Sequence, residues 1–405
     1  MKKIILLILS SLMLLFCGKI DEVSNKDSGN KNSGTNETYK IGITQIATHP
    51  SLDLVKQGFK KAFEEAGIKA NFDEKNAEGT IANATLIANG YKTDKKDLVL
   101  GIGTPSAQAL VNTITDIPVL FSAVTDPESA KLLNKNVTGT SDRLDNVGEQ
   151  LDLLLKLKPE IKKIAVLYNP SEQNSVVQVK EIEAKAKEKN LEVMLQGVSS
   201  LAELSQATKN ALIETDALYL PTDNLVVSGI KLITSEAKSA KKPVVSSENS
   251  SVEAGALFTM GLDYFELGKR TGEMAIEILK GKPAEQIPYE LSKKMTLYVN
   301  ETTAAELGLD LKKIDLTNNG TVTLKGEGST GIFASNIENP IGSGIYTGAL
   351  TDSSIKNTGI ITLDAKKTVG IYTPKSNISK VGNIIMTNKA DSSVGVYLTQ
   401  DAKAD

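Results

Sequence analysis

Leu98-Val99-Leu100-Gly101-Ile102-Gly103-Thr104-Pro105-Ser106 is the stretch that decides the fold. An apolar run typical of a buried strand ends here in a polar loop that contains a proline. Proline fits the first turn of a helix, where its missing N–H would be unpaired anyway, and Thr and Ser are common caps. A buried strand leading directly into a helix is the repeating unit of parallel α/β sheets.

The same arrangement occurs three more times in the first 170 residues. The apolar runs 41–46, 119–124 and 164–168 are followed by His49-Pro50, Thr125-Asp126-Pro127 and Asn169-Pro170. The carboxyl ends of parallel strands meet at one edge of a sheet, so we expect these loops to gather there. The free N–H groups and the positive dipole end of a helix start suit a small anion such as a carboxylate. The pattern therefore predicts a site for a small molecule.

Alternation of strands and amphipathic helices continues to about residue 311, and it occurs twice. It predicts a first α/β lobe at 39–143 and a second at 144–313, the latter including a return crossing. A chain of 405 residues is too long for one compact domain, and largely apolar strands imply parallel sheets covered on both faces.

The N-terminus has the architecture of a secretory signal. Lys2 and Lys3 precede an apolar stretch that ends at Phe16, directly before Cys17. Residues 1–17 resemble a bacterial lipoprotein signal peptide in which Cys17 is lipidated, although Phe16 stands where such signals favour a small residue. The alternative is an incidental cysteine in an uncleaved anchor. Residues 18–38 are polar and predict a flexible tether, so we expect an exported protein anchored to the cell membrane by lipid.

Composition argues against several classes of function. Lys and Arg number 46 and Asp and Glu 49, which gives no basic field for nucleic acid. One His and one Cys leave almost no material for a zinc site or a Cys–His dyad. We therefore expect no metal, no cofactor and no catalysis.

The character of the sequence changes in the tail, residues 314–405. Gly-apolar-aromatic triplets recur at 331–333, 344–346, 370–372 and 395–397 among short β-branched runs. They predict a β-rich, solenoid-like segment in which each rung covers the next. The tail resembles passenger repeats of fusobacterial-type autotransporter adhesins. A fused surface module, a gene-fusion remnant and a joined reading frame without function all remain open.

The first 311 residues resemble the tryptophan/tyrosine-type substrate-binding proteins of ABC transporters. The stretches that carry the resemblance are 42–46 with His49-Pro50, 103–109, 123–127, 136–142, 168–175, 221–224 and 261–264. The resemblance implies a type I periplasmic-binding fold, in which two Rossmann-like lobes close over an amino acid and feed a membrane permease. It covers neither the tether nor the tail.

Twelve residues are candidates for contact with such a ligand. Thr104 and Ser106 suit its carboxylate, unless they only cap the helix. Asp126, Asp223 and Asp263 are candidates for its ammonium group, with Asp223 and Asp263 favoured because Asp126 also fits a cap. The remaining candidates are Gln45 and His49 after the first strand, Asn169, Ser171, Asn174 and Ser175 at the start of the second lobe, and Tyr264, the favoured aromatic neighbour of an aromatic ligand.

These observations predict a monomeric solute receptor that captures an amino acid and delivers it to an ABC permease. The family favours aromatic amino acids, among which the sequence does not discriminate. The alternative is an adhesin or other interaction protein that acts through the repeats of the tail.

Overall fold

The computed structural model describes residues 38–292 and 295–309, and beyond them the backbone of ten short strands between 316 and 398. The predicted signal peptide, the tether up to residue 37 and Cys17 lie outside the described residues. Within the described part of the chain, no helix is both long and apolar enough to cross a membrane.

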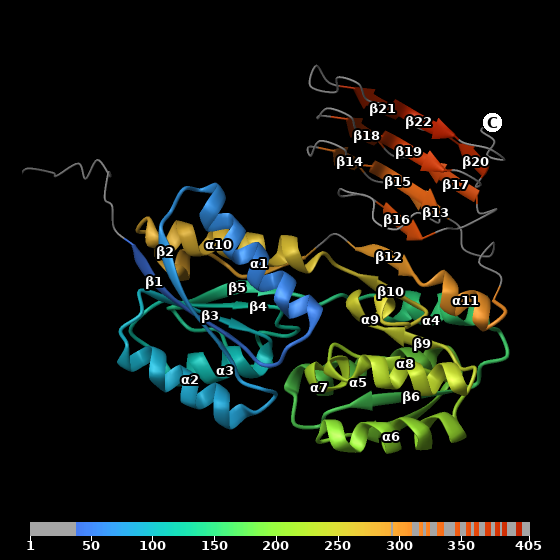
Figure 1. The fold of residues 1–405 in the computed structure, drawn as a ribbon, viewed down its shortest axis with the longest axis horizontal. Helices are drawn as coiled ribbons and strands as arrows, with labels where there is room; N and C mark the ends of the chain where they lie inside the picture. The colour runs from blue at the N-terminus through green and yellow to red at the C-terminus, as the bar shows by residue number, and fades with distance from the viewer. Residues whose placement is uncertain are drawn as a thin grey trace, which may run out of the picture. The chain divides into compact units, whose positions relative to one another are not determined.

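The first lobe is a six-stranded parallel sheet covered on both faces (Figure 1). Helices α1 and α10 cover one face, and α2 and α3 cover the other. The strands are apolar and buried where the chain predicts them to be, for example across Leu98–Ile102. In sheet order the strands are β11 (Glu290–Leu291), β5 (Val137–Ser141), β4 (Val119–Ser122), β3 (Leu98–Ile102), β1 (Tyr39–Gln45) and β2 (Ala70–Asn76); the helices are α1 (Pro50–Glu65), α2 (Ile81–Thr93), α3 (Thr104–Thr113) and α10 (Tyr264–Leu279), with a short 3-10 turn, η1 (Ala284–Gln286).

The second lobe repeats this winding. Its strands are parallel except for β12, which pairs antiparallel with β10. In sheet order they are β12 (Thr296–Val299), β10 (Phe258–Gly261), β9 (Val244–Ser246), β8 (Ala217–Leu220), β6 (Lys163–Tyr168) and β7 (Glu192–Gly197); the helices are α4 (Val147–Leu157), α5 (Gln173–Glu188), α6 (Leu201–Glu214), α7 (Asn224–Ser228), α8 (Ile230–Ser239), α9 (Ser250–Glu253) and α11 (Glu301–Glu306).

Both lobes reverse their strand order beside their first strand, between β1 and β3 and between β6 and β8. Such switch points, at the carboxyl ends of the strands, are where open α/β sheets bind ligands. The two α/β lobes predicted from the sequence are confirmed. A ligand site is therefore expected at the two switch points, at the carboxyl ends of β1 and β3 and of β6 and β8.

The return crossing requires a correction to the predicted boundaries. The sequence assigned it to a second lobe at 144–313, but α10 and β11 belong to the first lobe. Leu267 and Met274 of α10 lie in the first hydrophobic core, and β11 pairs with β5. The reason is the apolar face of α10, which packs tightly along α1.

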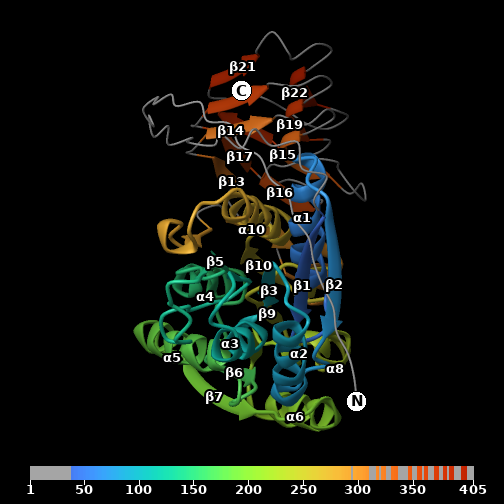
Figure 2. The same cartoon turned by 90° about the vertical axis from the view of Figure 1, so that its left-hand side faces the viewer.

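The strands described in the tail form three parallel stacks (Figure 2). The orders are β13-β17-β20, β14-β18-β21 and β16-β15-β19-β22. This pairing agrees with the predicted stacking of rungs. The bounds are β13 (Leu316–Asn318), β14 (Thr321–Leu324), β15 (Thr330–Ser335), β16 (Ile345–Gly348), β17 (Ser354–Asn357), β18 (Ile360–Leu363), β19 (Val369–Thr373), β20 (Asn377–Lys380), β21 (Asn383–Met386) and β22 (Val394–Leu398).

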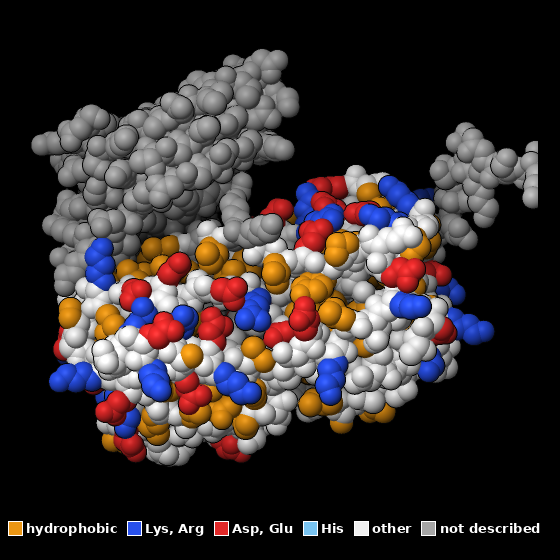
Figure 3. All heavy atoms as spheres, turned by 180° about the vertical axis from the view of Figure 1, so that it is seen from behind, with side chains coloured by type: hydrophobic (Ala, Val, Ile, Leu, Met, Phe, Trp, Pro, Cys, Tyr) orange, Lys and Arg blue, Asp and Glu red, His pale blue; other side chains and the backbone are white. Residues whose placement is uncertain are grey.

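The surface of the two lobes carries charges of both signs. On the face shown in Figure 3, acidic and basic side chains alternate and neither sign forms a broad patch. The surface charge on this face therefore does not point to any particular partner.

Candidate functional site

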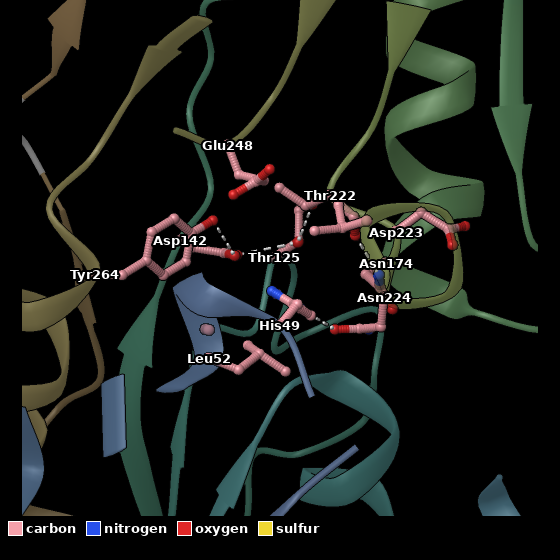
Figure 4. Close-up of a pocket in the computed structure, with 12 residues that line it drawn as sticks. His49, Leu52, Thr125, Asp142, Asn174, Thr222, Asp223, Asn224, Glu248 and Tyr264 are labelled. Carbon is pink, nitrogen blue, oxygen red and sulfur yellow. Dashed lines mark hydrogen bonds between the residues drawn. The ribbon is translucent and has the colours of Figure 1, made fainter. Parts of the chain in front are cut away.

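A cavity lies between the two lobes at the carboxyl ends of their strands (Figure 4). The space within it that a water molecule can enter is about 20 Å³, room for about one water, because the closed lobes meet closely here. The first lobe contributes residues from the start of α1, the loops after β4 and β5, and the start of α10. The second contributes the start of α5 and the loops after β8 and β9. The lining residues are His49, Leu52, Ala123, Thr125, Asp142, Asn174, Thr222, Asp223, Asn224, Val227, Glu248 and Tyr264.

The lining is acidic. Its twelve residues include three carboxylates, Asp142, Asp223 and Glu248, and neither lysine nor arginine. Buried carboxylates are costly unless hydrogen bonds or a cation compensate them. The hydrogen bonds that each one accepts therefore show which of them still lacks a partner.

Asp142 is the least compensated of the three. It is buried and accepts one hydrogen bond at each oxygen, from the Thr125 hydroxyl at 3.0 Å and the Tyr264 hydroxyl at 3.2 Å. Burial raises the pKa of Asp142 to about 6, and the hydrogen bonds from Thr125, from Tyr264 and from its own backbone N–H offset that effect only in part. A cation entering the cavity would stabilise this carboxylate most.

Glu248, in contrast, is surrounded by donors. It accepts hydrogen bonds from the backbone N–H groups of Ser250 and Ser251, at 2.9 and 2.7 Å, and from both of their hydroxyls. The hydroxyl of Ser51, in the first turn of α1, adds another at 2.5 Å from the opposite lobe. Glu248 thus fixes its own loop and joins the two lobes.

Asp223 is occupied in the same way. It caps α7 by accepting from the Val226 N–H, and it also accepts from the Asn169 N–H at 2.5 Å and the Ser175 hydroxyl at 2.6 Å. Burial raises the pKa of Asp223. These bonds tie the loop after β8 to the loop after β6, which is a structural task.

Glu172 lies directly behind this wall of the cavity. It accepts from the backbone N–H groups of Asn224 and Leu225 and from the side-chain amides of Asn174 and Asn224. Burial, with Asp223 close by, raises the pKa of Glu172 to about 7. Glu172 therefore fixes the orientation of two amides that line the cavity.

His49 faces the cavity from the start of α1. It is 7% exposed, and its Nε2 lies 3.5 Å from Oδ1 of Asn224 in the opposite lobe. Its Nδ1 has no hydrogen-bond partner among the described residues. Burial lowers the pKa of His49, against the opposing influence of Glu248 and Asp53, so the ring is neutral near pH 7.

Direct contacts between the lobes surround the cavity. Besides Ser51 with Glu248 and His49 with Asn224, the hydroxyls of Thr125 and Thr222 lie 3.1 Å apart. The only hydroxyl hydrogen of Thr125 goes to Asp142, so Thr222 donates in that pair. The lobes are therefore closed over the cavity.

Four of the twelve predicted site residues line this cavity: His49, Asn174, Asp223 and Tyr264. The structure brings them together from α1, α5, the loop after β8 and α10. Of three other aromatic residues near loop ends, Phe121 is buried in the first core, whereas Tyr168 is half-buried in the second lobe and Phe265 in the first.

Three of the other eight predicted residues have buried positions nearby. The Gln45 amide donates to the Ala47 carbonyl and to Asp53. Thr104 and Ser106 are buried in the first turn of α3, and neither hydroxyl has a hydrogen-bond partner among the described residues. That turn is close to the cavity wall, since a Cβ on Gly103 would lie 3.4 Å from Oδ1 of Asn224.

The remaining five have local structural tasks. Asp126 bonds Ser129 and pairs with Arg143. Asp263, one of the favoured ammonium candidates, caps α10 through the N–H groups of Phe265 and Glu266. Asn169 accepts from the backbone of Ser171, which is exposed, and Ser175 donates to Asp223.

Sequence reasoning missed Asp142, Glu248, Thr125, Thr222 and Asn224 as site residues. All five follow the ends of strands, and Thr125, Asp142, Thr222 and Asn224 lie inside the stretches quoted for the family resemblance. Their position after buried strands was the available signal. The turn after β4 shows why it was insufficient: Ala123 adopts a left-handed φ of 53°, and Thr125, not Asp126, enters the cavity.

The fold, the interlobe cavity and the sequence together define a solute-binding protein. The chain belongs to the ABC transporter substrate-binding protein family, which matches residues 40–319. This is a family of solute-binding proteins, not of enzymes.

Three relatives are informative. A protein named tyrosine-binding protein, from Clostridioides difficile, is 40% identical over 78% of this chain and 95% of its own length. The structure of an ABC domain in complex with L-Trp, from Streptococcus pneumoniae, is 35% identical, covers 66% of this chain and 95% of its own, and has a TM-score of 0.64. A substrate-binding protein with adhesive properties from Clostridium difficile, in its ligand-free, open structure, is 40% identical, covers 67% and 95%, and has a TM-score of 0.52.

Proposed function

We propose that this chain is an extracytoplasmic receptor that captures a free aromatic amino acid between its lobes and delivers it to an ABC permease. The observation that carries the proposal is the closed, acidic cavity in which the carboxylate of Asp142 is buried and, among the described residues, is bonded only by neutral donors. An amino acid supplies the missing charge as its ammonium group. Because the carboxylate is already buried, pairing it adds attraction, and the ammonium group is the only one of the two ions still to leave water.

The conformation of the chain supports this reading. The fold agrees better with the tryptophan complex, with a TM-score of 0.64, than with the ligand-free, open relative at 0.52, although the open relative is the more similar in sequence. Direct contacts across the cavity are what a closed receptor requires. We therefore infer that the lobes stand closer to the closed than to the open arrangement, and that they part slightly to take up an amino acid.

The contacts favour one placement of the ligand's charged ends. Asp142 replaces Asp223 and Asp263 as the partner for the ammonium group, since the oxygens of Asp223 are filled by hydrogen bonds and Asp263 is exposed outside the cavity lining. The first turn of α3 remains the candidate for the carboxylate, because the buried hydroxyls of Thr104 and Ser106 lack hydrogen-bond partners among the described residues. Leu52, Val227 and the ring of Tyr264 offer apolar surface for an aromatic side chain.

The mechanism is capture, closure and docking. The ligand joins the lobes by bonding to both, and closure buries it; the closed form is then the one that a permease recognises. Lipidation at Cys17 would hold the receptor, as a monomer, at the membrane that contains the permease.

A second candidate function is adhesion. The Clostridium difficile relative is described as a substrate-binding protein with adhesive properties. Its match covers 67% of this chain, which is too little to include the lobes and the whole tail, so its adhesion lends no support to adhesion through the tail. Adhesion through the tail is a separate hypothesis, which predicts that deletion of residues 314–405 abolishes adhesion.

The experiment is a thermal-shift screen of the twenty amino acids against the full chain. Tyrosine, tryptophan or phenylalanine should raise the melting temperature, because a ligand that binds only the folded state stabilises it. The chain without residues 314–405 should show the same shifts. If no amino acid stabilises either protein, the proposed function is wrong.

A further inference from the structure

His49 has a buried nitrogen without a partner, which the proposed placement of the ligand's charged ends does not use; among the described residues that line the cavity, the amide oxygen of Asn174 is a second such acceptor. His49 lines the cavity and is 7% exposed, and its Nδ1 has no hydrogen-bond partner among the described residues. A buried acceptor without a partner costs stability, so it marks a place where something outside the chain donates.

The tautomer of His49 follows from its neighbours. Glu172 Oε2 accepts from the side-chain N–H₂ of Asn224 at 2.5 Å, so the amide oxygen of Asn224 must point the other way, towards His49. That oxygen is an acceptor only, and Nε2 of His49 therefore carries the hydrogen. In the neutral ring Nδ1 is left as a bare acceptor.

His49 offers a ligand a neutral acceptor, whereas Asp142 offers a carboxylate. The groups that act on the ring of His49 are Glu248 and Asp53, electrostatically, and Asn224, its hydrogen-bond partner. An ammonium group will prefer the carboxylate of Asp142 to a neutral imidazole. The neutral acceptor instead suits a neutral donor, such as a phenol O–H or an indole N–H.

We propose that His49 is the specificity-determining residue of this receptor, and that its Nδ1 accepts a hydrogen bond from the ring O–H or N–H of the bound amino acid. Glu172 and Asn224 act as positioning residues that hold the required tautomer. This inference rests on the proposed function and extends it. The named ligands of two relatives, tyrosine and L-Trp, both have such a ring donor, whereas phenylalanine has none.

Calorimetric titration of the full chain with tyrosine, tryptophan and phenylalanine tests the binding part. Phenylalanine leaves the acceptor unpaired, so it should bind about tenfold or more weakly than the better of the other two. His49→Phe keeps a ring of similar size without the acceptor, so the difference in affinity between phenylalanine and the better of the other two ligands should shrink to about twofold. His49→Asn supplies another acceptor and should restore part of that difference. An unchanged preference in His49→Phe, or an equal loss for all three ligands, would overturn the proposal.

Nitrogen NMR of the imidazole tests the tautomer without any ligand. The chain has a single histidine, so its signals need no assignment. The protein should show the Nε2–H form near pH 7, and Glu172→Gln or Asn224→Ala should mix the tautomers. A dominant Nδ1–H form would refute the inference even if amino acids bind. Binding of no aromatic amino acid, with the Nε2–H form present, would instead identify the proposed function as the step that failed.

Discussion

At the scale of single residues, the role of each carboxylate in the cavity depends on how many hydrogen-bond donors reach it. Glu248 and Asp223 have their oxygens filled by the backbone and by serine hydroxyls. Asp142 has one hydroxyl at each oxygen and no cationic partner within the described lobes. The same residue type therefore has a structural role at two positions and a proposed binding role at the third.

Asp142→Asn should separate binding from stability. The amide removes the charge that holds the ammonium group, and amino-acid affinity should fall by about tenfold to a hundredfold, the worth of a charge-assisted hydrogen bond. The unliganded variant should nevertheless melt higher than wild type at pH 8, because a buried, uncompensated charge is gone. Calorimetry and thermal denaturation measure the two effects, and a variant that binds normally would refute this role for Asp142.

The pKa of Asp142 gives the sign of a pH dependence. Its folded value of about 6 lies above its unfolded value of about 3.9, so the folded protein takes up this proton preferentially between those values. The stability of the unliganded protein should therefore fall by about 3 kcal/mol as the pH rises through that window, about two units at 1.36 kcal/mol each. Comparing wild type with Asp142→Asn in denaturant melts isolates this contribution from that of Glu172.

Ligand affinity should respond to the same proton in the opposite direction. Below pH 6 Asp142 is protonated before the ligand arrives, so titrations with tyrosine should show affinity falling as the pH falls. Asp142→Asn serves as the control, since without this carboxyl group the affinity should lose the pH dependence. An affinity independent of pH between 5 and 8 would contradict the account.

Residue-level prediction from the sequence reached the right loops more reliably than the right side chains. Two neighbouring polar residues after a strand are equivalent in a sequence, yet only one enters the cavity. Thr125 does so and Asp126 does not, because the backbone turns over at Ala123. Some predicted ligand contacts, such as Asp263, are helix caps instead, because helix caps and binding sites use the same types of polar side chain.

At the scale of elements, the α1–α10 pair positions much of the first lobe's wall. His49 precedes α1 and Leu52 lies in its first turn, while Tyr264 opens α10. The two helices pack at backbone distance: a Cβ on Gly58 would lie 2.0 Å from the Phe265 carbonyl, and one on Gly268 would lie 1.9 Å from that of Val55. Long-range packing of this kind explains why α10 returns to the first lobe, which local sequence patterns did not predict.

Replacing two helical glycines by alanine should test this packing, because one substitution should lower the free energy of unfolding and the other should raise it. Gly58→Ala should destabilise the protein by about 3 kcal/mol, since the new Cβ forces α1 and α10 apart. Gly90→Ala, in α2, meets only the end of Lys75 at 3.9 Å and should stabilise by about 0.5–1 kcal/mol. Urea denaturation of both variants measures the difference, and equal effects would contradict the assigned packing.

At the scale of the whole molecule, the strand–helix repeats predict both lobes because apolar strands and helix caps are local signals. Closure is not a local signal. It depends on residues about 200 positions apart, such as Ser51 and Glu248, which are separated by 197 positions in the chain and meet only when the lobes do. No pattern within one lobe identifies its partner in the other.

The Ser51–Glu248 bond should act on ligand retention. It exists only in the closed form, so Ser51→Ala should raise the ligand dissociation rate about twofold to tenfold and leave the association rate nearly unchanged. Ser171→Ala is a matched control, since Ser171 is exposed on the second lobe and was itself a predicted contact. Stopped-flow kinetics measures both rates in the two variants. A change in the association rate of Ser51→Ala alone would argue against a role of this bond in closure.

If the two lobes close over one amino acid held at Asp142, both the stoichiometry and the affinity should show it. Calorimetric titration of tyrosine and tryptophan into the full chain and into Asp142→Asn measures both quantities. We expect one ligand per wild-type chain and binding weakened at least tenfold in the variant. Absence of binding to wild type, or equal affinity in the two proteins, would contradict it.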